Sequence, residues 1–167
     1  MDRVLVGNAV FFIGALIMIA TGFIRNKNRI LGVQCVQFAV MGIGQAILGG
    51  FTGAITNLVS ILRNLFGIRT KFGLPFKLVF CAVQIGMTFF VAPKTLIDWF
   101  PTMSACLYTW FLDIKSAIIF KVIMILCQVL WVVYDFIIQN YVGMVFDVST
   151  MVSLGAGIVM LQKAKEK

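Results

Sequence analysis

Long apolar stretches separated by short polar loops are the feature that most constrains the fold of this chain. Seven such stretches can be drawn, at about residues 4–24, 30–48, 51–68, 74–92, 95–112, 115–138 and 140–161. A helix of about 18–24 residues is roughly 27–36 Å long, enough to cross a hydrocarbon core of about 30 Å. The sequence therefore predicts an all-α membrane protein with seven transmembrane helices.

The composition agrees with a chain that lies in a membrane. It is 61% hydrophobic and 12% charged, with a mean hydropathy of +1.03, whereas about a quarter of the residues in a soluble domain are charged. The first apolar stretch follows Asp2 and Arg3 and lacks an A-x-A cleavage pattern, so we expect a retained span instead of a signal peptide. The net charge of +8 comes from basic residues that lie mostly between apolar stretches. We therefore expect the lipid bilayer as a partner and no nucleic acid.

Basic residues are distributed unevenly between the two ends of the predicted helices. With seven spans, only Arg3 and Lys94 fall on one side of the membrane, and the other twelve fall on the opposite side. These are Arg25, Lys27, Arg29, Arg63, Arg69, Lys71, Lys77, Lys115, Lys121, Lys163, Lys165 and Lys167. The positive-inside rule then predicts an external N-terminus and a cytoplasmic C-terminus. Arg63, Lys77 and Lys121 lie within apolar stretches, and we expect them to extend along the helix surface to the cytoplasmic interface.

The chain repeats itself weakly at an offset of ninety residues. A shift from Gly53 to Gly143 superposes the first three apolar stretches on the last three, and polar positions fall on polar positions. The superposed pairs are Asn8 with Asp98, Arg25 with Lys115, Gln45 with Asp135, and Asn57 with Asp147. Two three-helix units of the same orientation need one extra span between them, a 3+1+3 layout known in secondary transporters. The predicted parts are a first repeat at 1–68, a linker helix at 69–93, and a second repeat with a basic tail at 94–167.

Two polar residues lie near the middle of predicted spans, Asn57 in the third and Asp147 in the seventh. Each follows a glycine by four residues, so a small residue and a polar residue share one helix face. An uncompensated Asp at the bilayer centre costs roughly 2.5–3.5 kcal/mol, so Asp147 must face protein, water or a ligand. Both residues are candidate solute-binding residues, and desolvation of Asp147 would permit coupling to protons. The alternative is a structural pair of Asn57 and Asp147 that only holds the two repeats together.

Six further residues complete the candidate binding set: Gln45, Asp135, Asn8, Asp98, Trp131 and Tyr134. The first four lie near the outer ends of their spans, and the two aromatic residues lie one turn before Asp135. Amides and carboxylates suit a small polar solute, to which a tryptophan ring adds a stacking face and a tyrosine adds a hydroxyl. The alternatives are that the span-end residues meet headgroups or water and that Trp131 is a packing residue.

The sequence lacks the residue patterns that common catalytic and metal-binding sites require. There is no histidine, no acid pair at hydrolase spacing and no cysteine beside a base, so we expect no enzyme. Cys35, Cys81, Cys106 and Cys127 show no CxxC spacing and are expected to be reduced thiols, with no metal or cofactor. A lone GxxxG pattern at residues 49–53 permits a homodimer.

Five short motifs are spread along nearly the whole chain. They are TGAITNLVSILRN at residues 52–64, WFPTMS at 99–104, WF at 110–111, WVVYDF at 131–136 and GMVFD at 143–147. These motifs resemble the YgjV-type bacterial inner-membrane proteins, a family with no established activity to carry over. The resemblance implies a multi-pass location in the bacterial inner membrane. More distantly, the chain is similar to the SWEET, SemiSWEET and PQ-loop proteins, which consist of two three-helix bundles and a linker helix.

The distant resemblance carries an expectation about the solute. SWEET transporters place an Asn on the third and the seventh helix around the sugar; Asn57 matches this pattern and Asp147 departs from it. The departure leaves room for a cationic or proton-coupled solute in place of a neutral sugar. The proline-glutamine signature of PQ-loop proteins is absent, and only Pro101 is similar to it. The resemblance thus implies a SWEET-like transporter of a sugar or related metabolite by alternating access; the alternative is a non-transporting receptor or assembly protein with the same pocket.

Overall fold

Each of the seven apolar stretches forms an α-helix in the computed structural model of this chain. The structure describes residues 2–21, 27–70, 73–91, 94–112, 114 and 116–165, and these residues contain helices and no strand. The helices are α1 (Arg3–Thr21), α2 (Lys27–Leu48), α3 (Phe51–Arg69), α4 (Leu74–Phe90), the 3-10 helix η1 (Ile97–Trp99), α5 (Phe100–Phe111), α6 (Ala117–Ile137) and α7 (Tyr141–Lys165). The prediction of an all-α protein with seven helices is confirmed over these residues.

Among the described residues, four helices are long and apolar enough to cross a membrane. They are α2, α3, α6 and α7, with apolar segments at Leu31–Leu48, Phe51–Arg69, Ile118–Ile137 and Tyr141–Lys163. Within the described part of the chain, α1 and α4 contribute shorter apolar segments, Arg3–Ile17 and Leu74–Phe90. The seven predicted helices are therefore present, and four of them have the full length of a span.

The fifth apolar stretch, predicted as one span over residues 95–112, is divided between η1 and α5. Asp98 Oδ2 accepts hydrogen bonds of 2.9 Å from the backbone N–H groups of both Lys94 and Thr95, at the start of η1. Pro101 then lies in the first turn of α5, where its missing N–H is not needed. With 12 residues, α5 is about 18 Å long and shorter than a hydrocarbon core.

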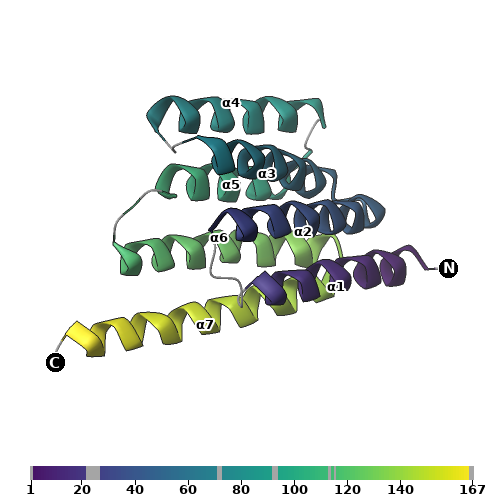
Figure 1. Ribbon diagram of the computed structural model, residues 1–167. Helices are drawn as coiled ribbons and strands as arrows, with labels where there is room; N and C mark the ends of the chain where they lie inside the picture. The colour runs from purple at the N-terminus through teal and green to yellow at the C-terminus, as the bar shows by residue number, and fades with distance from the viewer. Residues whose placement is uncertain are drawn as a thin grey trace.

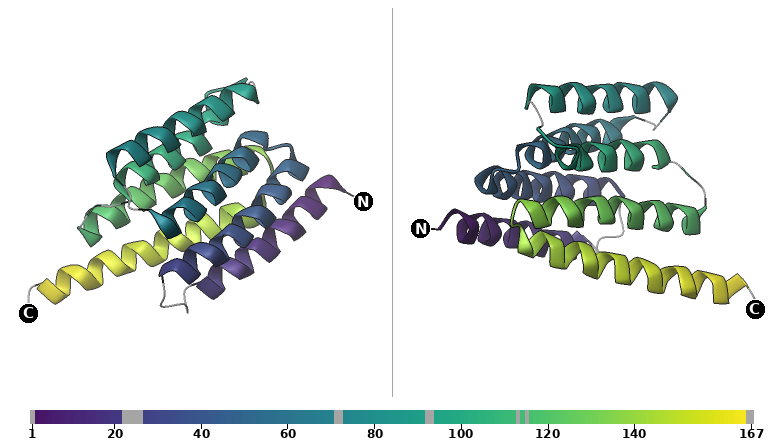
Figure 2. Two further views of the ribbon diagram at one scale, coloured as in Figure 1. Left: turned by 45° about the horizontal axis from the view of Figure 1, so that its top comes forward. Right: turned by 180° about the vertical axis from the view of Figure 1, so that it is seen from behind.

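The helices form two layers with one helix along an edge. Figure 1 shows α1, α2 and α3 in one layer, α5, α6 and α7 in the other, and α4 beside α3 and α5. Neighbours in sequence pack together within each layer, while α1 contacts α7 and α3 contacts α5 between the layers. Both views in Figure 2 show the same order from other directions. The helices thus close a ring in chain order, and α3 is enclosed by α2, α4 and α5.

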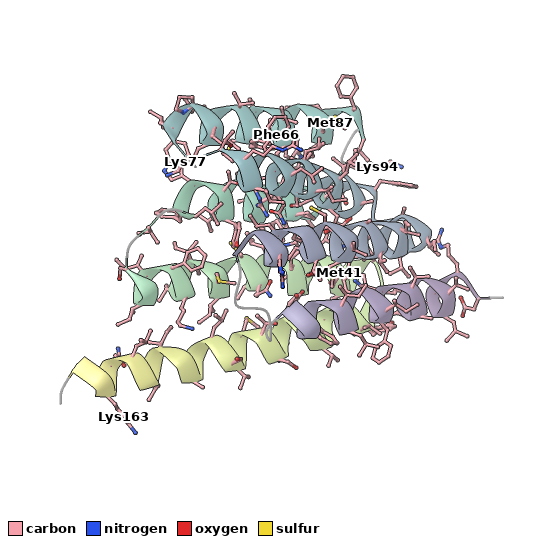
Figure 3. The ribbon with its side chains drawn as sticks, viewed as in Figure 1. Met41, Phe66, Lys77, Met87, Lys94 and Lys163 are labelled. Atoms are coloured by element: carbon pink, nitrogen blue, oxygen red, sulfur yellow. The ribbon has the colours of Figure 1, made fainter. Side chains whose placement is uncertain are left out.

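The termini and the labelled basic side chains lie at the two ends of this bundle. The N- and C-termini are at opposite ends (Figure 1). Lys77 and Lys163 lie towards the end that carries the C-terminus, and Lys94 lies towards the other end (Figure 3). Four of the basic residues counted in the sequence, Arg25, Lys71, Lys115 and Lys167, lie outside the described residues.

The surface and the interior have the polarity of a membrane protein. Large apolar side chains are exposed on all seven helices, and polar side chains such as Gln84 and Asn140 are fully buried. A small apolar cluster of Phe11, Ala15 and Met41 packs between α1 and α2 (Figure 3). All four cysteines are free thiols. Because the interior is more polar than the surface, the contacts between helices include many hydrogen bonds that water would otherwise make.

Three pairs of helix boundaries in the two halves of the chain differ by ninety positions. α2 begins at Lys27 and α6 at Ala117, and α3 begins at Phe51 and α7 at Tyr141. Likewise, α1 ends ninety residues before the end of α5. The offset found in the sequence therefore also applies to the starts of α2 and α6, the starts of α3 and α7, and the ends of α1 and α5.

The turns between α2 and α3 and between α6 and α7 share one backbone conformation. Each contains a residue with positive φ, Gly49 at 88° and Gln139 at 62°, and these are the two such residues in the described chain. In each turn the next backbone N–H donates to a carbonyl oxygen five residues earlier, over 2.8 Å in both cases: Gly50 to Gln45 and Asn140 to Asp135. The two hairpins thus fold alike, ninety residues apart.

Candidate functional site

Polar residues follow the buried face of α3 along its whole length. They are Thr52, Thr56, Asn57, Ser60, Arg63 and Asn64. Their partners come from the surrounding helices and form two groups. We call the first the carboxyl cluster, consisting of Gln45, Asn57, Tyr134, Asp135, Asn140 and Asp147. We call the second the arginine cluster, consisting of Gln34, Arg63, Asn64, Gln84, Tyr108 and Thr109.

The carboxyl cluster begins with an amide pair between α2 and α3. Asn57 Nδ2 donates to Gln45 Oε1 over 2.7 Å and to the carbonyl of Gly53 over 3.2 Å. Both side chains are buried, with 1% of Gln45 and 6% of Asn57 exposed. A Cβ on Gly53 would lie 2.7 Å from Gln45 Oε1 and 2.8 Å from the Tyr134 ring. Glycine at this position therefore allows α2 and α6 to approach α3.

Tyr134 joins α6 to the first turn of α3. Its hydroxyl accepts a hydrogen bond from the Gly53 N–H over 2.9 Å and lies 3.0 Å from the Thr52 hydroxyl, which donates to it. The phenol thereby satisfies one of the free N–H groups at the helix start. Trp131, half-buried, packs edge-on against Tyr134 with ring centroids 5.8 Å apart. The Trp131 ring thus has a packing contact inside the chain.

Asp135 lies next to Tyr134 on α6 and is 1% exposed. Its carboxyl group is beside the side-chain amides of Gln45 and Asn140. A Cβ on Gly143 would collide with Asp135 Oδ2 and Asn140 Nδ2, so Gly143 has the same role on α7 as Gly53 on α3. Two atoms here are buried without a hydrogen-bond partner, Asp135 Oδ1 and Asn140 Nδ2.

Asp147 brings a second carboxyl group to the cluster from α7. It is close enough to Asp135 for the two groups to repel each other when both are charged, and its Oδ2 is buried without a partner. Among the described residues, no basic side chain acts on either carboxyl group. The hydrogen bonds of the Asn57 side chain go to Gln45 and Gly53, and none joins it to Asp147. A buried pair of this kind requires a proton or a cation to balance its charge.

Asn8 and Asp98 lie outside the carboxyl cluster, at helix ends. Asn8 Oδ1 accepts from the Val142 N–H over 3.0 Å, and its Nδ2 donates to the Gln139 carbonyl over 2.8 Å, so it fastens α1 to the start of α7. Asp98 caps the turn that leads into η1. Of the eight predicted binding residues, the structure thus brings Gln45, Asn57, Tyr134, Asp135 and Asp147 together, with Trp131 against Tyr134.

Arg63 does not reach the interface as predicted, because it lies on the buried face of α3 and is 6% exposed. Its Nη1 donates to Thr109 Oγ1 over 3.4 Å and its Nη2 to Asn64 Oδ1 over 3.5 Å. Its guanidinium lies over the ring of Tyr108, with Cζ 4.8 Å from the centroid. The Nε atom of Arg63 is buried without a partner. Arg63 follows Thr56 by seven residues and Ser60 by three, a spacing that could have placed it on the buried polar face of α3.

Gln84 is a second residue that the sequence predictions missed. It lies on α4, is 2% exposed, and its Nε2 donates to Thr56 Oγ1 over 2.8 Å and to Thr102 Oγ1 over 3.4 Å. Its Oε1 is buried without a partner. Thr88, one turn further along α4, bonds to Thr102 over 2.6 Å. The sequence signal that could have identified this buried polar face is the pair of a glutamine and a threonine four residues apart in an apolar stretch.

Comparisons with known proteins identify a family. The model of a family described as Imp-YgjV, bacterial inner membrane protein, matches residues 5–165. No curated protein and no solved structure matches the chain. The YgjV-type resemblance and the inner-membrane location predicted from the sequence are confirmed, whereas the likeness to SWEET and PQ-loop proteins stays a prediction.

Proposed function

We propose that this chain, which belongs to the Imp-YgjV family of bacterial inner membrane proteins, moves a small polar solute across that membrane by alternating access. The observation that carries the proposal is the carboxyl cluster. Two carboxyl groups and three amides meet inside the bundle, and Asp135 Oδ1, Asp147 Oδ2 and Asn140 Nδ2 are buried without partners. Such atoms are costly unless a ligand or water completes their hydrogen bonds.

The free atoms of the carboxyl cluster define what the solute offers. Asp135 Oδ1 and Asp147 Oδ2 can each accept a hydrogen bond, so the solute carries at least two donors. With no basic side chain beside the carboxyl groups in the described chain, a cationic solute would balance their charge. A neutral hydroxylated solute such as a sugar would need a proton on the pair, and transport would then be linked to protons.

The moving parts in this proposal are the two halves of the chain. α1–α3 and α5–α7 act as three-helix repeats, α4 links them, and the repeats rock about the carboxyl cluster. The matching hairpins support this division, because both contribute to the cluster: Gln45 and Asn57 from the first, and Asp135 and Asp147 from the second. We further propose an external N-terminus and a cytoplasmic C-terminus, with Lys77 and Lys163 near the cytoplasmic end.

Ligand-induced stabilisation followed by uptake tests this proposal. The purified protein is screened by thermal unfolding against sugars, amino acids, polyamines and nucleosides, and each compound that binds is tested for uptake into proteoliposomes. A solute at one hundred times its dissociation constant should stabilise the protein by about 2.7 kcal/mol. We expect Asp147→Asn and Asn57→Ala to abolish both stabilisation and uptake. Asp98→Asn makes the same chemical change as Asp147→Asn outside the cluster and should retain both.

Two other results would change the conclusion. Binding at the cluster without uptake at any proton gradient would favour a receptor or assembly protein with the same pocket. Stabilisation that Asp147→Asn leaves intact would mean that the solute binds elsewhere.

A further inference from the structure

We infer that Arg63 and the cavity beside it form a binding site for a small monovalent anion of about the size of chloride. Arg63 follows Asn57 by six residues on α3, about 9 Å along the helix axis. The site is therefore separate from the carboxyl cluster, and it does not depend on the transport proposal.

The cavity lies where α3, α4 and α5 meet. It is lined by four polar residues, Ser60, Arg63, Gln84 and Thr109, and by three apolar ones, Val59, Phe80 and Ala105. Its volume is about 10 Å³, which is enough for one water molecule or an ion of similar size. A phosphate or a carboxylic acid would extend beyond this space.

Arg63 brings an unused donor and an unbalanced charge to the cavity. Its two terminal nitrogens bond to Thr109 and Asn64, while its Nε–H is buried without a partner. A guanidinium cannot lose its proton inside a protein, so its charge persists when it is buried. The groups that act on it among the described residues are Tyr108 and two cysteines, and none of them is a carboxylic acid. A bound anion would supply both the acceptor and the opposite charge.

The amide of Gln84 distinguishes an anion from a water molecule. Gln84 Oε1 is buried without a donor, while Nε2 bonds to Thr56. If the amide turns over, the Thr56 hydroxyl donates to Oε1, and the Gln84 N–H group faces the cavity. Thr109, which accepts from Arg63, still has an O–H to donate. The groups around the cavity then act as donors, an arrangement that suits a ligand with acceptor capacity only.

Chloride itself is the probe in the experiment. The full-length protein in detergent is unfolded by heat in sodium chloride and in sodium gluconate at equal ionic strength. We expect a saturable rise in apparent Tm of at least about 2 °C with chloride. Bromide should act like chloride and sulfate should not, because sulfate exceeds the cavity.

Two variants of Arg63 and one control variant test whether the chloride response depends on Arg63. Arg63→Gln removes the charge, and Arg63→Lys keeps the charge but lacks the Nε–H; both should lose at least tenfold in chloride affinity. Arg69→Gln removes the same charge at the exposed end of α3 and should keep the wild-type response. If Arg63→Gln does not fold, the lysine variant still decides the outcome.

Three outcomes would overturn the inference. The first is a wild-type protein whose Tm is the same in chloride and gluconate, which would mean that the cavity holds water only. The second is an equal chloride response in all three variants. The third involves Asp113, which lies outside the described residues: a chloride response that appears only in Asp113→Asn would mean that this residue balances Arg63 within the chain.

Discussion

The carboxyl cluster and the arginine cluster share α3 but differ in how they relate to the two halves of the chain. The residues of the carboxyl cluster occur in both halves, since Gln45 and Asn57 correspond to Asp135 and Asp147 at an offset of ninety residues. The arginine cluster has no such counterpart. The position ninety residues after Arg63 is Ser153, which is exposed on α7.

This difference arises because the corresponding helices α3 and α7 are buried to different extents. Half of the apolar segment of α3 is buried, compared with 6% of that of α7, because α4 and α5 cover α3 while α7 lies at the edge of the bundle. Polar residues near the starts of α3 and α7 meet where the two hairpins contact each other. Towards the C-terminal ends of these two helices, α3 is enclosed and α7 is not, so of the two only α3 can bury an arginine.

The largest effect is expected when Asn57 in the first half is replaced by the aspartate found at the corresponding position, 147, in the second half. Asn57→Asp places a third carboxyl group in the cluster, against Gln45, and should destabilise the protein by about 2.5–3.5 kcal/mol. Asp147→Asn in the same chain returns the cluster to two carboxyl groups and should recover most of that loss. SDS titration in micelles measures the unfolding of the wild type, the two single variants and the double variant, and so gives the coupling energy between positions 57 and 147. An Asn57→Asp protein as stable as the wild type would mean that water already solvates the cluster.

The next prediction asks whether both hairpins need glycine at the same place. Gly143→Ala puts a Cβ onto Asp135 and Asn140, and Gly53→Ala puts one onto Gln45 and the Tyr134 ring. Each should cost about 1–3 kcal/mol, because the neighbours must shift out of hydrogen-bonding positions. Gly155→Ala on α7 meets no atom within 4 Å and should be neutral or slightly stabilising.

Thermal unfolding of the three alanine variants measures these costs. A loss at position 53 without one at position 143 would mean that the two hairpins pack differently, contrary to their matching turns.

The carboxyl cluster was more predictable from the sequence than the arginine cluster, for a physical reason. A polar residue in the middle of an apolar stretch cannot form hydrogen bonds with water, so Asn57 and Asp147 had to face the interior and contact other polar groups. Arg63 lies near the end of its stretch, where a long side chain can reach water from any face. The spacing from Thr56 and Ser60 places Arg63 on their face of α3, but only the enclosure of α3 by α4 and α5 decides that this face is buried so near the end of the stretch. An apolar helix carries no periodicity that would predict this enclosure.

The ends of helices were the other place where sequence reasoning did not suffice. Asn8 and Asp98 looked like intramembrane polar residues, yet Asn8 accepts from a backbone N–H at the start of α7 and Asp98 accepts from backbone N–H groups of the turn before η1. Short polar side chains compete for such groups. The start of α5 has a different local cause, because Pro101 lies in its first turn. Where a helix begins depends on these local bonds, whereas the apolar stretch only bounds it.

A smaller effect contrasts two tyrosines, one in each cluster. Tyr134→Phe removes the hydroxyl that bonds to the Gly53 N–H and to Thr52, and should cost about 1–2 kcal/mol. Tyr108→Phe keeps the ring face on which the Arg63 guanidinium lies, and should change stability by less than about 0.5 kcal/mol. Thermal unfolding of both variants tests the contrast. Equal losses would mean that the Tyr108 hydroxyl also holds the arginine cluster.

The smallest effect concerns the two turns, where the halves adopt one conformation with different residues. Gln139 has a φ of 62°, which strains a residue with a Cβ, whereas Gly49 adopts its φ of 88° without strain. Gln139→Gly should therefore stabilise the protein by up to about 1 kcal/mol, and Gly49→Ala should destabilise it by about the same amount. Opposite shifts in Tm for these two variants are the expected result. If Gln139→Gly destabilises instead, the Gln139 side chain makes a contact that outweighs its backbone strain, and the likeness of the two turns ends at the backbone.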